Sequence, residues 1–241
     1  MKARALWAIV FGLMIGSARA EQTLVLSSAL YAPITSEKRD GVLDMVYREL
    51  GKRLGIKIEI RHMAAAERAL LNVNEGVVDG DAGRIAGMSK NYPDMVAVPV
   101  PVMKYEMAVF SRNVDFRVAG PGSIKPYNIG IVRGWKVLEQ VSSGAQSVIL
   151  VDNAEQMFSM LDKNRVDIVL LEKLEGMQII ESMGIKGVRP LRPNLLEGYF
   201  YLYLNKKHES LIPRIAAELR KMEQDGSLKR IYDSVRSRYA R

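Results

Sequence analysis

Residues 148–172 read VILVDNAEQMFSMLDKNRVDIVLLE, and the order of patterns in this stretch predicts the fold. The apolar run 148–151 predicts a strand, after which Asp152 or Asn153 can cap a helix. Val166–Leu171 is a second apolar run of strand length. Because strand, helix and strand in this order build parallel α/β sheets, the stretch predicts an α/β protein.

The same alternation extends in both directions from this unit. On the N-terminal side we predict a strand at Thr23–Ser27, a helix at 43–54, a strand at Ile56–Ile60, a helix at 65–75 and, from Val77–Asp81, a third strand. A second set comprises strands at Met107–Phe110 and Tyr127–Val132, a helix from Trp135, the unit 148–171 and a helix at 174–183. The polar segment Ala119–Gly122 lies within this second half, and two sets of this kind predict two α/β lobes.

The C-terminal segment predicts how the lobes are connected. Gly198–Asn205 (GYFYLYLN) reads as a strand, and two amphipathic helices follow, divided at Asp225-Gly226. Since no strand follows them, we expect the helices to pack back on the first lobe. We therefore expect lobe 1 at 21–108 and 201–241, with lobe 2, residues 109–200, inserted in it.

The first twenty residues read as a secretion signal. Lys2 and Arg4 precede an apolar run of 12 residues, Ala5–Gly16, and Ala18-Arg19-Ala20 fits a cleavage site. The run is short for a membrane-spanning helix, although an uncleaved anchor is the alternative. We expect a cleavable signal peptide, residues 1–20, and a periplasmic protein.

Composition excludes several classes of site. The chain has no cysteine and two histidines, His62 and His208, so disulfides, thiolate chemistry and a His-rich metal site are not expected. The net charge is +8, without a run of five or more bases, which does not favour nucleic-acid binding. Neither a phosphate-binding loop nor a dinucleotide fingerprint occurs. We expect no cofactor, no metal and no enzymatic activity.

Four segments carry a resemblance to a known family. The segments are Glu75–Asp79 (EGVVD), Tyr127–Gly134 (YNIGIVRG), Arg165–Glu172 (RVDIVLLE) and Glu223–Tyr232 (EQDGSLKRIY). In this order, behind a signal peptide, they resemble bacterial extracellular solute-binding proteins of family 3, the periplasmic amino-acid-binding components of ABC importers. The likeness extends over nearly all of residues 22–238.

The resemblance implies a two-lobed periplasmic-binding-protein-like fold. Each lobe would be a mainly parallel sheet flanked by helices, and the ligand would lie in the cleft between lobes. Hinges would lie near Tyr105–Ser111 and Phe200–Leu204. The chain lacks the family's usual Thr-x-x-Arg after the third strand, and it has Trp135 where a Thr often follows the second-lobe glycine. It resembles a divergent member.

Five residues are predicted to bind the ligand: Tyr31, Arg68, Arg84, Trp135 and Glu172. Arg84 lies beyond a strand end, where open α/β sheets place ligands, and its guanidinium could pair with a carboxylate. Trp135 could cover the ligand, and Glu172 could accept a hydrogen bond from a ligand amine. Tyr31 could stack on the ligand, and Arg68 could reach the cleft.

Each of these residues also has a structural alternative. Arg84 could pair with a nearby aspartate, Asp79 or Asp81, and Arg68 could pair locally on its helix. Trp135 could be a packed interface aromatic and Tyr31 a surface-loop residue. Glu172 could be an acid at a helix start, stabilised by the helix dipole.

The predicted function is capture of a small amino-acid-like or organic-acid ligand for an inner-membrane ABC permease, by a monomer. One alternative is a ligand-sensing subunit that reports to a membrane sensor. Another is a periplasmic dehydratase on the same scaffold, because some dehydratases acting on prephenate-like acids resemble this family. Glu172 would then be the candidate acid or base.

Overall fold

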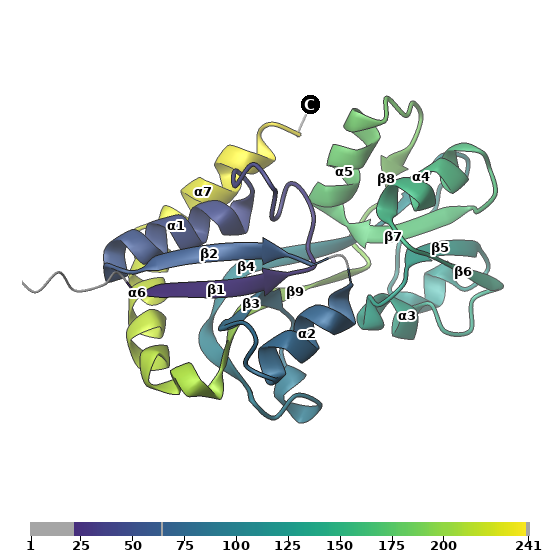
Figure 1. The fold of residues 1–241 in the computed structure, drawn as a ribbon. Helices are drawn as coiled ribbons and strands as arrows, with labels where there is room; N and C mark the ends of the chain where they lie inside the picture. The colour runs from purple at the N-terminus through teal and green to yellow at the C-terminus, as the bar shows by residue number, and fades with distance from the viewer. Residues whose placement is uncertain (1–21, 64, 240–241) are drawn as a thin grey trace, which may run out of the picture.

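The computed structural model describes residues 22–63 and 65–239, which form an α/β fold on one nine-stranded sheet (Figure 1). The predicted signal peptide, residues 1–20, lies outside the described residues. The strands are β1 (Thr23–Ser28), β2 (Lys57–His62), β3 (Gly80–Arg84), β4 (Met95–Ser111), β5 (Asn128–Val132), β6 (Ser147–Val151), β7 (Ile168–Glu172), β8 (Arg189–Pro190) and β9 (Leu196–Asn205). The helices are α1 (Val42–Leu54), α2 (Ala66–Asn74), α3 (Lys136–Val141), α4 (Ala154–Asp162), α5 (Lys173–Ser182), α6 (Ile212–Gln224) and α7 (Ser227–Arg236). Short 3₁₀ segments lie at Met88–Lys90, Pro121–Ile124 and Lys206–Leu211.

The sheet is parallel at its two ends and antiparallel in its middle. The strand order is β2-β1-β3-β9-β4-β7-β5-β6, and β8 pairs with β4. β1 runs parallel to β2 and β3, and β5 runs parallel to β6 and β7. β9 and β4 lie antiparallel between these two sets and run from one to the other. The predicted two-lobed fold with an inserted second lobe is confirmed, and the two long strands connect the lobes.

The predicted amphipathic helix near the N-terminus is α1. Its apolar face, with Leu43, Val46 and Leu50, is buried against the sheet, which is the stabilising contact that its three- and four-residue spacing predicts. It ends at Gly55, whose φ of 65° is the left-handed conformation that glycine adopts without strain. Figure 1 shows α1 and α2 on opposite sides of β1 and β2.

In the second lobe, Asn153 rather than Asp152 caps α4. Its side chain accepts a hydrogen bond of 2.8 Å from the backbone N–H of Gln156. Met157, Phe158 and Leu161 of α4 are buried in a core cluster that is separate from the main one, which extends through both lobes. The quoted stretch 148–172 therefore forms the predicted strand, helix and strand.

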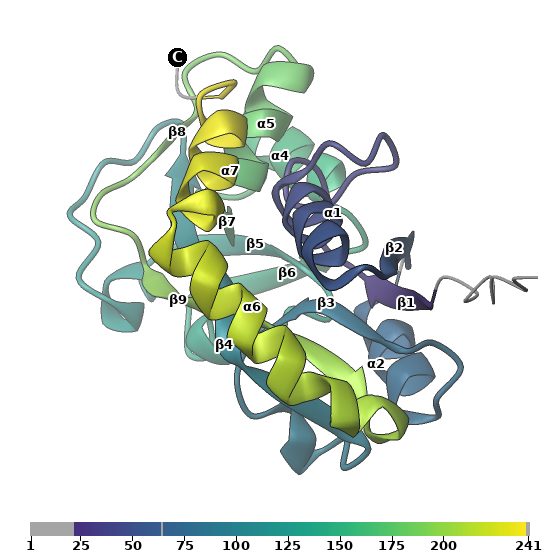
Figure 2. The same ribbon diagram turned by 90° about the vertical axis from the view of Figure 1, so that its left-hand side faces the viewer.

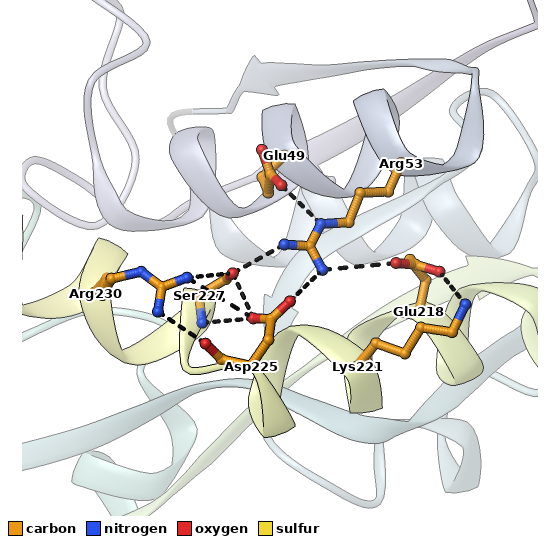
Figure 3. Close-up of polar contacts among 7 residues, drawn as sticks. All are labelled: Glu49, Arg53, Glu218, Lys221, Asp225, Ser227 and Arg230. Carbon is orange, nitrogen blue, oxygen red and sulfur yellow. Dashed lines mark hydrogen bonds and ion pairs between the residues drawn. The ribbon is translucent and has the colours of Figure 1, made fainter.

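The C-terminal helices pack back on the first lobe, as predicted. Both α6 and α7 contact α1 (Figure 2). Arg53 of α1 joins them, with Nη1 lying 2.7 Å from the Asp225 carboxylate and 3.7 Å from that of Glu218 (Figure 3). Nη2 of Arg53 donates to the hydroxyl of Ser227 at 2.9 Å. These contacts fix the last helices to the first, across more than 160 residues of sequence.

Two predicted strand boundaries are wrong. β4 begins at Met95 instead of Met107, and its first half contains Pro99 and Pro101, which weaken the sequence signal of a strand. Its pairing with β9 changes register between Ala97 and Met103, near these prolines. The third strand occupies Gly80–Arg84 instead of Val77–Asp81.

Within the described residues, no helix is long and apolar enough to cross a membrane.

Candidate functional site

A small cavity lies where the two lobes meet. It has a volume of about 90 Å³ and is lined by residues from both lobes. The first lobe contributes the end of β3, the start of α2 and the segment after β1, while the second lobe contributes the turn between β5 and α3. Met107 of β4 and Phe200 of β9 complete the wall. The volume is small beside the few hundred Å³ of ordinary small-molecule pockets.

Arg84, at the end of β3, is one of the predicted residues that line this cavity. Its Nη2 lies 2.9 Å from Oδ2 of Asp81 and 3.4 Å from the carbonyl oxygen of Ala66. Its Nε is buried and has no hydrogen-bond partner. The structural alternative for Arg84 is therefore realised with Asp81, while one buried donor of the guanidinium, Nε, is left unsatisfied.

Asp81 is held firmly in place. Its side chain is 1% exposed and accepts hydrogen bonds of 3.1 Å from the Ser27 hydroxyl and from the backbone N–H of Gly83. A buried carboxylate needs partners of this kind to remain charged. Asp81 therefore orients Arg84 and balances its charge.

Trp135 is the second predicted residue that lines the cavity. It precedes α3, and its side chain packs against both of the larger core clusters, so its structural alternative is also realised. The preceding residue, Gly134, has a φ of 91°, and a Cβ at this position would lie 3.7 Å from Cβ of Ala66. The backbone of the second lobe therefore comes into close contact with the start of α2 in the first lobe.

Glu172 does not line the cavity. It is fully buried at the end of β7, and its side chain accepts hydrogen bonds from the backbone N–H groups of Leu174 at 2.7 Å and Glu175 at 3.0 Å. It caps α5, which is the structural alternative for this residue. Burial raises the pKa of Glu172 to about 7.

Glu175 is a buried acid that the sequence did not single out. Its side chain is 1% exposed, and Oε2 has no hydrogen-bond partner. Burial, followed by the charge of Glu172, raises the pKa of Glu175 well above its usual value. Because an acid on a helix usually faces solvent, the sequence pattern gave no signal for this residue.

Tyr31 and Arg68 lie outside the set of cavity-lining residues. Tyr31, in the segment after β1, is 40% exposed, and burial together with the charges of Glu175 and Glu155 raises its pKa. It therefore lies within electrostatic range of the second lobe. Arg68 is exposed on α2. Of the five predicted ligand-binding residues, the structure brings Arg84 and Trp135 together in one cavity, and the roles of all five stay predictions.

The remaining lining residues are mostly apolar, and sequence reasoning missed them. They include Leu30, Leu70, Ile85, Met88, Met107 and Phe200. Their only sequence signal is position, because several lie at or just after the ends of strands. Lys136, next to Trp135, is the other charged lining residue. Among the residues that the structure describes, no group of three or more His, Asp or Glu side chains could hold a metal ion.

Comparison with known proteins places this fold in a recognised class. No family model matches the chain. An uncharacterized protein from Shewanella oneidensis is 23% identical over 206 residues, which cover 81% of this chain and 76% of that protein. The solved structures below are all under 20% identical and therefore report on the fold.

Three solved structures superpose over most of this chain. The GluR0 ligand-binding core in complex with L-glutamate has a TM-score of 0.76 and 14% identity, covering 91% of this chain and 99% of that one. A histidine kinase sensor domain similar to periplasmic binding proteins has a TM-score of 0.74 and 17% identity, covering 89% and 96%. The substrate-binding protein AbpA of an amino acid ABC transporter from Streptococcus pneumoniae, bound to L-arginine, has a TM-score of 0.72 and 13% identity, covering 90% and 95%.

The chain has the fold of the bacterial periplasmic binding proteins, as the family resemblance predicted. The compared structures are a ligand-binding core, a sensor domain and a substrate-binding protein.

Proposed function

We propose that this chain is a periplasmic solute-binding protein that captures a small amino-acid-like or organic-acid ligand and delivers it to an ABC permease. The observation that carries the proposal is the cavity between the lobes, to which the first lobe contributes Arg84 and the second Trp135. The arginine-bound transporter protein that this fold resembles supports the same role. The ligand would bridge the lobes and stabilise their closed arrangement.

The proposal assigns the lobes the boundaries 21–108 with 201–241, and 109–200. The mobile connection would be the pair β4 and β9, because they are the strands that pass between the lobes. The pairing of β4 with β9 is irregular between Ala97 and Met103. The β9 residues opposite this irregular part are Tyr201–Tyr203, which belong to the predicted hinge at Phe200–Leu204. Closure would then bring Trp135 towards Arg84 around the ligand.

Thermal unfolding against a ligand panel tests this function. The panel would contain amino acids, dicarboxylates, polyamines, aromatic acids and aliphatic acids. A ligand at a hundred times its Kd stabilises the folded protein by about 2.7 kcal/mol, which raises Tm by several degrees. The shift should disappear in Arg84→Gln and remain in Arg220→Gln, an exposed arginine on α6. A cooperative melt that no member of the panel shifts would contradict the proposal.

A sensor subunit is the second candidate, and the similarity to a histidine kinase sensor domain favours it. Both functions use the same cleft, so ligand binding alone does not separate them. Deleting the gene separates them in cells. Loss of uptake of the ligand would indicate transport, whereas normal uptake with loss of a ligand-dependent transcriptional response would indicate sensing.

A further inference from the structure

The charged residues that line the cavity are all cations. Of its lining residues, Arg84 and Lys136 are charged, and both are cations. The side chain of Lys136 is 72% exposed, and its Nζ donates a hydrogen bond of 3.3 Å to the carboxylate of Glu139. Exposed ion pairs of this kind are weak, so a ligand carboxylate could compete for the ammonium group. The acids that act on Tyr31, Glu155 and Glu175, do not line the cavity.

Arg84 has a donor to offer even though Asp81 neutralises part of its charge. The ion pair with Asp81 uses Nη2, and Nε is buried without any acceptor. Nη1 takes no part in the contacts of Arg84 with Asp81 and Ala66, so it is the guanidinium nitrogen that a ligand oxygen would contact. A carboxylate placed between Arg84 and Lys136 would meet a cation on each lobe.

The rest of the cavity wall suits a hydrocarbon. Leu30, Leu70, Ile85, Met107 and Phe200 surround the space that the body of the ligand would occupy. An ammonium group in this space would lose its hydration and find no carboxylate among the lining residues to replace it, which is unfavourable. The cavity is small beside ordinary ligand pockets, which favours short ligands or some opening of the lobes.

We propose that the ligand is a short apolar monocarboxylate without an α-amino group, held by Arg84 and Lys136 and covered by Trp135. This inference rests on the proposed solute-binding function and narrows its ligand class. It separates this chain from the compared proteins whose structures hold L-glutamate or L-arginine.

Matched ligand pairs test the inference by isothermal titration. The pairs are butanoate with 2-aminobutanoate, 4-methylpentanoate with L-leucine, and 3-phenylpropanoate with L-phenylalanine. Within the pair that fits best, the acid should bind at least about tenfold tighter than the amino acid. It should also bind tighter than its neutral amide, because the amide does not gain the two cations.

Variants identify the site. Lys136→Gln should weaken binding of the acid several-fold, and Asp81→Asn combined with Arg84→Gln should abolish it. The double variant removes both members of the buried pair, so that no charge is left unpaired in the fold. Circular dichroism and a cooperative melt check that it is folded. Arg220→Gln, on the exposed side of α6, should bind as the wild type does.

The contrary outcomes distinguish failure of the monocarboxylate inference from failure of the solute-binding function. Tighter binding of the amino acids than of the acids overturns the monocarboxylate inference and leaves the solute-binding function intact. Silence of all three acids, with a hit elsewhere in the broad thermal-unfolding panel, has the same meaning. Silence in both experiments overturns the inference together with the proposed function.

Discussion

Arg84 and Asp81 form an ion pair of 2.9 Å at the wall of the interlobe cavity, and the aspartate is buried on the side away from solvent. The pair has two roles. It joins two side chains at the end of β3, and it holds Arg84 in the cavity wall. Stability and ligand binding therefore depend on the same two side chains.

Single substitutions in this pair should destabilise the fold more than the double substitution. Arg84→Gln leaves the buried carboxylate of Asp81 without its cation, and we expect a loss of about 3 kcal/mol in the free energy of unfolding. Asp81→Asn combined with Arg84→Gln should lose less than Arg84→Gln alone, because neither charge is then stranded. Urea unfolding of the wild type, both single variants and the double variant measures the coupling. Additive losses would show that the pair is not coupled.

Glu172 should make the stability of the fold depend on pH. Its pKa of about 7 lies above its usual value because it is buried, so the folded protein holds a proton that the unfolded chain releases. Its stabilising contribution is complete below the unfolded pKa and is lost as pH rises through about 7. Relative to Glu172→Gln, whose amide can still cap α5, the wild type should lose up to about 1.4 kcal/mol per pH unit between pH 5 and 7.

Urea unfolding of both proteins at pH 5, 6, 7 and 8 measures this difference. Glu197→Gln is a suitable control, because the hydrogen bond from Lys104 lowers the pKa of the exposed Glu197 and keeps it ionised over this range. Its difference from the wild type should stay constant with pH. Parallel curves for Glu172→Gln and the wild type would contradict the prediction.

Gly176 should not tolerate a side chain, although it lies inside a helix. A Cβ at this position of α5 would overlap the ring of Phe110 on β4, so the close packing of helix on strand requires glycine. Gly176→Ala should lower the free energy of unfolding by about 1–3 kcal/mol, although alanine has a higher helix propensity than glycine. Gly122→Ala, where a Cβ meets nothing within 4 Å, should change stability by less than about 0.5 kcal/mol. Equal effects of the two substitutions would refute the packing argument.

Most helices and strands of the fold were predictable from sequence, because the apolar spacing that indicates them lies within each element. In α1 and in the strand–helix–strand stretch 148–172, the spacing of the apolar residues indicates which side of each element is buried. The first half of β4 was missed, because Pro99 and Pro101 suppress the strand signal while pairing with β9, about a hundred residues away, supplies the partner. Non-local pairing of this kind leaves little trace in the sequence of either strand.

The candidate site was predictable in position and not in detail. Arg84 lines the cavity as the last residue of β3, and Trp135 lines it from the turn after β5. Glu172 also ends a strand, but the free N–H groups at the start of α5 take its carboxylate, and the sequence cannot decide between a helix cap and a ligand. The apolar lining residues come from both lobes, so only the assembled fold brings them together.

Closure of the lobes can be tested with engineered cysteines, since the chain has none of its own. Cβ of Ala66 and a Cβ built on Gly134 lie 3.7 Å apart, within the range of a disulfide, and the two residues belong to different lobes. Ala66→Cys combined with Gly134→Cys should therefore cross-link on oxidation, at a cost of about 1–2 kcal/mol for a side chain at the positive φ of position 134. Each single variant, oxidised in parallel, should show no intramolecular link by mass spectrometry.

Ligand binding should respond to this cross-link in two ways. A ligand that stabilises the closed lobes should speed the reaction, because it increases the population in which the two thiols meet. The cross-linked protein, once emptied of ligand, should bind poorly, because a cavity of about 90 Å³ gives a ligand little room to enter. Reduction should restore binding. Unchanged affinity in the linked form would mean that the ligand binds without opening of the lobes, and the clamp mechanism would then be wrong.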